Sequence, residues 1–159
     1  MDLAAYHLDL STAATHHPFR GDAAGTRQAL EAATAGLRPG RILALRSLCV
    51  GGSAAPDRHL QMLDFRLPVN DASERIVEAT VRAMGLHGWL LSSGRSYHFL
   101  GSRTLASPEE LMAFLGRALL FAPIVDGRWV AHQMIEGQCA LRVSSGNPEQ
   151  IVPALVSEV

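Results

Sequence analysis

The sequence predicts a layered α+β domain, with a mainly antiparallel sheet and helices packed on one face. Segments that alternate apolar and polar residues, as strands do, are interspersed with segments that have the apolar spacing of helices. The 159 residues suit one domain with a hydrophobic core, and 48% hydrophobic with 18% charged residues is an ordinary globular composition. Two adjacent short strands around a Ser-Gly turn favour antiparallel pairing.

The N-terminal part of the chain is expected to contribute one helix. Residues 1–21 are turn-rich and are predicted to be a loosely ordered segment, so that residues 22–159 form the single domain. A helix is expected from Gly25 to Leu37, because apolar residues recur there at helical spacing and Pro39-Gly40 then ends it.

Two strands follow in the prediction. Residues 41–50 are expected to form one continuous strand. The alternation around Asp64 predicts a second strand, with Leu63 and Phe65 on one face and Asp64 and Arg66 on the other. The first face is expected to pack into the core.

Three later helices are indicated by their first residues. Asp71 fits the start of a capping box. Ser107, followed by proline and two glutamates, is an N-cap for a helix that runs to about Phe121. Asp126 is expected to cap a short helix that ends at Gly137, and a last strand through Leu141-Arg142 follows.

A hairpin is predicted from residues 88–93 and 95–101. Its second strand alternates aromatic and polar residues, so that Tyr97 and Phe99 point into the core. His98 then points to the opposite face of the sheet.

The turn of this hairpin, Ser93-Gly94-Arg95-Ser96, has the features of an anion site. Gly94 permits backbone torsions that other residues avoid, and its small size lets an anion approach the amides. Arg95 and His98 can then donate hydrogen bonds, which predicts a phosphate site. A lone strand histidine is also common as a structural residue, and that alternative stays open.

One side of the sheet is expected to remain open and to carry the polar side chains. If the helices cover the aromatic face, then Asp64, Arg66, Ser96 and His98 lie on the other face. This prediction assumes that the two strands are neighbours, and it places a site on the uncovered side.

The charges limit the choice of partner. The net charge is −1, and all fourteen basic residues are arginine, which genome composition can also explain. Phosphate contacts must therefore come from guanidinium groups, backbone amides or histidine. A chain so close to neutral is not expected to carry a broad basic surface for duplex DNA, but it can contain a local triphosphate pocket.

The remaining composition points to a cytoplasmic protein. No apolar run approaches the length of a transmembrane helix, and the N-terminus lacks the pattern of a signal peptide. Cys49 and Cys139 stand in apolar stretches, so two buried thiols are expected, and no zinc-binding spacing is present.

The order of the polar motifs resembles the archaeo-eukaryotic primase superfamily over about residues 60–146. The motifs are Leu63-Asp64-Phe65-Arg66, the Ser-Gly-basic turn with His98, Ile124-Val125-Asp126-Gly127 and the Leu141-Arg142 strand. The sequence looks most like the small primase-like proteins of bacteria and, more distantly, the polymerase domain of bacterial ligase D. The resemblance implies an RRM-like, primase-type domain.

The resemblance also implies roles for particular residues. Asp64, Asp126 and His98 would be catalytic, and Asp64 and Asp126 would hold a divalent metal ion, Mg²⁺ or Mn²⁺. A second set would bind the nucleotide: Ser93, Gly94, Arg95, Ser96, His98, Arg66 and Arg142.

The sequence departs from the superfamily pattern at Arg66, where a second carboxylate is expected. A positive charge there weakens a two-metal centre, because carboxylates must hold the two ions. Arg66 could instead pair with a phosphate or with Asp64, and that last pair could be an ordinary surface ion pair. Asp126 could likewise be an N-cap and nothing more.

The function expected from the resemblance is a primase-like nucleotide-binding domain, a degenerate nucleotidyltransferase acting on nucleoside triphosphates and nucleic acid. The alternative is a non-catalytic partner that senses a nucleotide or a strand end within a DNA- or RNA-handling or defence complex. A structural domain without a ligand is the third interpretation. Single-stranded nucleic acid, a primer end and a protein partner are the further partners expected.

Overall fold

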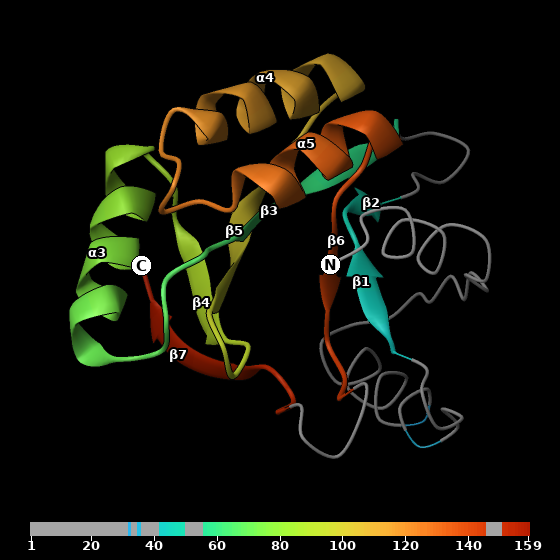
Figure 1. Cartoon of the computed structure of the whole chain (residues 1–159). Coiled ribbons are helices and arrows are strands. Elements are labelled where there is room, and N and C mark those ends of the chain that lie inside the picture. The colour runs from blue at the N-terminus through green and yellow to red at the C-terminus, as the bar shows by residue number, and fades with distance from the viewer. Residues whose placement is uncertain (1–31, 33–34, 36–41, 50–55, 146–150) are drawn as a thin grey trace. The chain divides into compact units, whose positions relative to one another are not determined.

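The computed structural model of the chain describes residues 32, 35, 42–49, 56–145 and 151–159 (Figure 1). The chain divides into two compact units, Met1–Gly36 and Leu37–Val159. Of the first unit, Ala32 and Ala35 are described, and both are helical, as predicted for that region. The predicted segment at residues 1–21 lies outside the described residues.

The second unit contains a five-stranded sheet in which all neighbouring strands are antiparallel. Its strand order is β2 (Leu48–Cys49), β3 (Arg58–Asp64), β5 (Tyr97–Leu105), β4 (Gly88–Ser92) and β7 (Ala154–Glu158). A two-stranded antiparallel sheet pairs β1 (Ala44–Arg46) with β6 (Ala140–Arg142). The hairpin predicted around the Ser-Gly turn is confirmed as β4 and β5.

The described helices of this unit are α3 (Asp71–Ala83), α4 (Pro108–Leu119) and α5 (Gly127–Glu136). The predicted N-caps Ser107 and Asp126 are confirmed. Helix α3 starts differently, because Asn70 rather than Asp71 has the extended backbone of a cap and its side chain accepts the Ser73 N–H at 2.9 Å. None of the helices in the described ranges is both long and apolar enough to cross a membrane.

The hydrophobic core lies between the larger sheet and the helices. Helices α4 and α5 pack across β3 and β5 (Figure 1), and α3 contributes the buried Val77 and Val81. Tyr97 and Phe99 are fully buried in this core, as their alternation predicts. The α+β class, with a mainly antiparallel sheet and helices packed against it, is therefore confirmed.

The single strand predicted at residues 41–50 is wrong, because the chain bends at Ser47 and continues from β1 in one sheet to β2 in the other. Ser47 is fully buried and bonds in three directions. Its N–H donates to Cys139 O at 2.8 Å, its carbonyl accepts from Leu60 N at 2.8 Å, and its Oγ accepts from Cys139 N at 2.9 Å. These bonds join the two sheets.

The side of the larger sheet opposite the helices was expected to be open, but it is covered in part. A small cavity there is lined both by Leu91 and His98 of the larger sheet and by Leu45 and Leu141 of the smaller one. His98 is consequently only 8% exposed. The alternation of β5 predicts which way His98 points, but it contains no information on the second sheet.

Two further features differ from the sequence-based expectations. Strand β7 was not expected, and it extends the larger sheet by pairing with β4. Cys139 is buried as predicted, but Cys49 is exposed, because β2 is a two-residue strand at the edge of the sheet.

Candidate functional site

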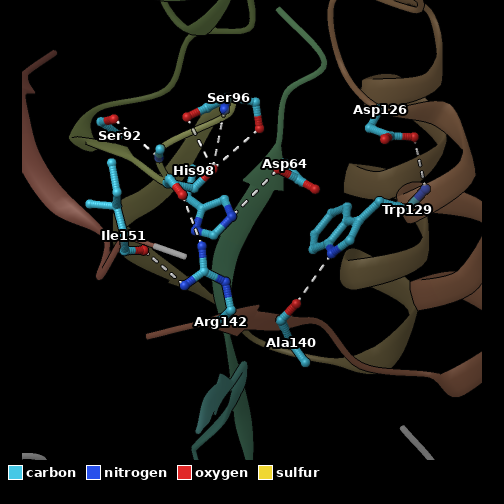
Figure 2. A network of polar contacts seen from close by, with 11 residues as sticks. Asp64, Ser92, Ser96, His98, Asp126, Trp129, Ala140, Arg142 and Ile151 are labelled. Carbon is cyan, nitrogen blue, oxygen red and sulfur yellow. Dashed lines mark hydrogen bonds and ion pairs between the residues drawn. The ribbon is translucent and has the colours of Figure 1, made fainter. Parts of the chain in front are cut away.

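Asp64 and His98 face each other across two neighbouring strands. Asp64 is the last residue of β3, and His98 is its direct partner on β5. The antiparallel register therefore places both side chains on the same face, and His98 Nε2 lies 3.6 Å from Asp64 Oδ1 (Figure 2). The sequence predicts both residues as site residues, and the sheet brings them together.

The surroundings of this pair favour the neutral form of both groups. Burial, and then the negative charge of Asp126, raise the pKa of Asp64 to about 7. Burial, and then the positive charge of Arg142, lower the pKa of His98 to about 4. Asp64 Oδ1 is buried and has no hydrogen-bond partner among the described residues. A buried oxygen without a hydrogen-bond partner is costly, so Asp64 Oδ1 is available to bind a water molecule or a ligand atom.

The main chain holds Asp126 next to Asp64. Asp126 N donates to Asp64 O at 2.9 Å, and Phe65 and Val125 form an isolated antiparallel bridge beside them. The Asp126 side chain caps α5, because its Oδ1 accepts the N–H groups of Arg128 at 2.9 Å and Trp129 at 3.1 Å. The alternative that Asp126 acts as an N-cap is therefore confirmed. Neither capping bond uses Asp126 Oδ2, so this oxygen can bind another partner.

The β4–β5 turn is closed by its own hydrogen bonds. Ser93 N donates to Ser96 O at 2.8 Å, and Ser93 Oγ donates to the same carbonyl at 3.1 Å. Gly94 has φ +94°, the positive angle expected there, but its N–H donates to Ser92 Oγ at 3.3 Å. Arg95 is exposed at the tip. An anion would therefore compete with serine hydroxyls for these amides.

Arg142 connects this turn to the C-terminal part of the chain. Its Nη2 donates to Ser93 O at 2.8 Å, and its Nη1 donates to Ile151 O at 3.0 Å and to Ser144 O. Burial, and then the positive charge of Arg95, lower the pKa of Arg142, whereas Asp64 raises it. Figure 2 shows its guanidinium group beside the His98 ring.

Among the described contacts of the site, none is made by the side chain of Arg66. Arg66 follows the end of β3, its side chain is exposed, and its backbone N–H donates to Ile124 O at 2.9 Å. Within the described part of the chain, the ionic contact of Asp64 is with His98 and not with Arg66. The predicted nucleotide-binding role of Arg66 thus has no geometric support from its neighbours.

Two neighbours of the site were not identified from the sequence. Ile151 and Pro153 lie against the turn and the His98–Arg142 cavity. Trp129 donates from Nε1 to Ala140 O at 3.2 Å and thereby connects α5 to β6 (Figure 2). No sequence motif marks Ile151 or Pro153, because their position depends on the pairing of β7.

Comparison with known protein families identifies the family to which this chain belongs. The family model described as archaeo-eukaryotic primase 1D-like (AEP-like) matches residues 23–154. The chain belongs to this family, and the superfamily suggested by its motifs is confirmed. No curated protein and no solved structure matches the chain.

The family implies a divalent metal ion, and the donor set fits one such ion better than two. Among the described residues Asp64 Oδ1 has no hydrogen-bond partner, and Asp126 Oδ2 takes no part in the capping bonds, so these two carboxylate oxygens could bind a metal ion. Oxygen ligands suit Mg²⁺ and Mn²⁺, and water and phosphate would complete the coordination. No cluster of three acidic, histidine or cysteine ligands occurs in the described ranges. Two ions would need more carboxylates than this.

Proposed function

We propose that this primase-like domain binds a nucleoside triphosphate at the ends of β3 and β6 and the start of β5, with the phosphates on Arg95 and Arg142. The observation that carries the proposal is the bond from Arg142 Nη2 to Ser93 O at 2.8 Å, which places the Arg142 guanidinium group against the turn that carries Arg95. Two cations held near each other favour a polyanion between them, because it relieves their repulsion. A triphosphate is the polyanion that a primase-like domain would meet.

The neighbouring groups support nucleotide binding more than two-metal catalysis. His98 is neutral at physiological pH, because its pKa is about 4, so it offers one N–H to a phosphate oxygen and no charge. Arg66 replaces a carboxylate and is exposed. The domain would then bind or sense a nucleotide without catalysing a reaction, as a subunit that works with a protein partner in a DNA- or RNA-handling complex.

Nucleotidyl transfer with a single metal ion is the second candidate function. It is favoured by the buried Asp64 Oδ1, which has no hydrogen-bond partner in the described part of the chain, and by the main-chain bond that holds Asp126 beside Asp64. A bound cation would neutralise part of the growing charge on the phosphates. A single-stranded nucleic acid or a primer end would supply the attacking hydroxyl, which Asp64 and Asp126 would face.

Calorimetric titration of ATP, with and without Mn²⁺, tests the proposal. Arg95→Ala should weaken ATP binding about tenfold, because one charge-assisted contact is worth roughly 1.5 kcal/mol. Arg103→Ala removes an equally exposed arginine from the other end of β5 and should leave binding unchanged.

The outcomes separate the candidate functions. Binding that needs Arg95 but no Mn²⁺ supports the nucleotide-binding proposal. Binding that requires both Mn²⁺ and Asp64, lost in Asp64→Asn, supports nucleotidyl transfer and calls for a primer-extension assay. If ATP does not bind, or if both arginine variants behave alike, the proposed phosphate site is wrong.

A further inference from the structure

The residues just before β7 cross the predicted phosphate turn. The last paired residue at this end of β4, Ser92, is the partner of Ala154, the first residue of β7. Residues 151–153, which lead into β7, therefore lie next to the start of the β4–β5 turn. We call these three residues the C-terminal strap.

The strap makes contact with three parts of the site. A Cβ built on Gly94 would lie 3.1 Å from Ile151 Cβ, so this side chain lies directly over the glycine. The Ile151 carbonyl accepts from Arg142 Nη1 at 3.0 Å. Pro153 lines the small cavity that His98 and Arg142 also line.

We propose that the C-terminal strap is an intramolecular competitor of phosphate, and that a nucleotide must displace it to reach Arg142 and Gly94. A guanidinium group has five N–H donors. Carbonyls of Ser93, Ser144 and Ile151 already accept three bonds from the two Nη atoms of Arg142, and a phosphate oxygen would replace the Ile151 carbonyl. The inference rests on the nucleotide binding proposed above.

The strap is held weakly enough to be displaced. Ile151 and Val152 remain 62% and 49% exposed, so lifting them costs little buried apolar surface. Strand β7 is the last strand in the order of the larger sheet, with β4 as its partner. Edge strands open more easily than central ones, because fewer hydrogen bonds must break.

A matched pair of strap variants tests the competition. Ile151→Ser uncovers Gly94 and should raise the affinity for ATP and for inorganic tripolyphosphate about threefold, because the competent state becomes more populated. Val152→Ser changes the adjacent exposed residue and should leave both affinities unchanged, because the three atoms nearest to a Cβ on Gly94 all belong to Ile151. Equal effects of the two substitutions, or weaker binding by Ile151→Ser, would overturn the proposal.

Hydrogen exchange of the wild-type chain gives an independent measurement. Saturating tripolyphosphate should protect the turn at residues 93–96 and increase exchange at Ala154 and Leu155, because the strap lifts and β7 frays. Protection of both segments would show that the strap clamps the ligand, and the competition would be wrong. If calorimetry detects no ligand binding to any variant, the proposed function itself is wrong, and the strap inference with it.

Discussion

Asp64 and His98, which are partners on neighbouring strands, have opposite pKa shifts whose effects on the pH dependence of stability nearly cancel. Folding shifts the pKa of Asp64 from 3.8 to about 7 and the pKa of His98 from 6.5 to about 4. Between about pH 4 and 6.5 the folded pair holds its proton on Asp64, and the unfolded chain holds one on the histidine. Both states bind one proton, so the pair contributes little pH dependence to stability in this range.

Single substitutions should reveal the two opposite contributions. In Asp64→Asn only the lowered pKa of His98 remains. The free energy of unfolding should therefore fall as the pH drops from 6.5 towards 4, because the histidine takes up a proton in the unfolded chain but not in the folded one. His98→Asn leaves the raised pKa of Asp64, so stability should fall as the pH rises from 4 towards 7. Each slope should reach at most about 1.4 kcal/mol per pH unit, the value for one proton.

Urea unfolding at half-unit pH steps measures these slopes, each taken relative to the wild-type chain. Slopes of the same sign in both variants would contradict the assignment of the two protonation states. Such a result would mean that one of the two groups is ionised in the folded chain between about pH 4 and 6.5.

At the scale of elements, α5 depends on a cap that also belongs to the site. Asp126 accepts two N–H groups of the helix, and its charge raises the pKa of Asp64. Asp126→Ala should therefore cost about 1 kcal/mol of stability and also lower the pKa of Asp64. Asp126→Asn should retain the cap but still lower this pKa, because asparagine caps helices as well as aspartate does.

Carboxyl NMR titration and urea unfolding separate these two effects. Ser107→Ala removes the cap of α4 and is the matched control. It should cost a similar amount of stability and leave the titration of Asp64 unchanged. An unchanged Asp64 pKa in Asp126→Asn would show that the Asp126 charge does not reach the site.

Some helices and strands could be predicted from the sequence, and others could not. The starts of α4 and α5 were predictable, because the cap residues and the helix are adjacent in sequence. The hairpin was predictable for the same reason. Strand β7 and the break at Ser47 were not, since each depends on pairing with a segment remote in the chain.

At the scale of the whole domain, Ser47 joins the two sheets. Its Oγ accepts from Cys139 N at 2.9 Å and contacts His59 Nδ1 at 3.2 Å, all within the buried interior. Ser47→Ala leaves the buried Cys139 N–H without this partner, which should cost about 1–3 kcal/mol. Ser102→Ala, which removes an exposed hydroxyl bonded to the His87 carbonyl, is the control and should cost less than about 0.5 kcal/mol.

Chemical unfolding of both serine variants measures the difference. A similar loss of stability in the two would mean that the hydroxyl of Ser47 is not what fastens the sheets. A selective loss in Ser47→Ala would support the smaller sheet as an integral part of the domain.

The motifs predict four polar residues that the fold brings together, but they predict neither the exposed position of Arg66 nor what covers the candidate site. The motifs identify Asp64, His98, Asp126 and Arg142, and the fold brings all four together. The covering by the smaller sheet and by residues 151–153 comes from contacts between segments far apart in sequence. The sequence pattern shows which residues are polar, whereas their burial depends on which distant segments of the chain pack over them.

The distance between Asp64 and Asp126 is maintained by peptide groups, through the bond from Asp126 N to Asp64 O. Any residue except proline at position 126 can donate that bond, and any residue at position 64 can accept it. The scaffold can thus tolerate mutational drift of its acidic side chains while the spacing of the two positions persists. A lineage of such domains could lose its chemistry and later regain it by point substitution, without having to evolve a new fold.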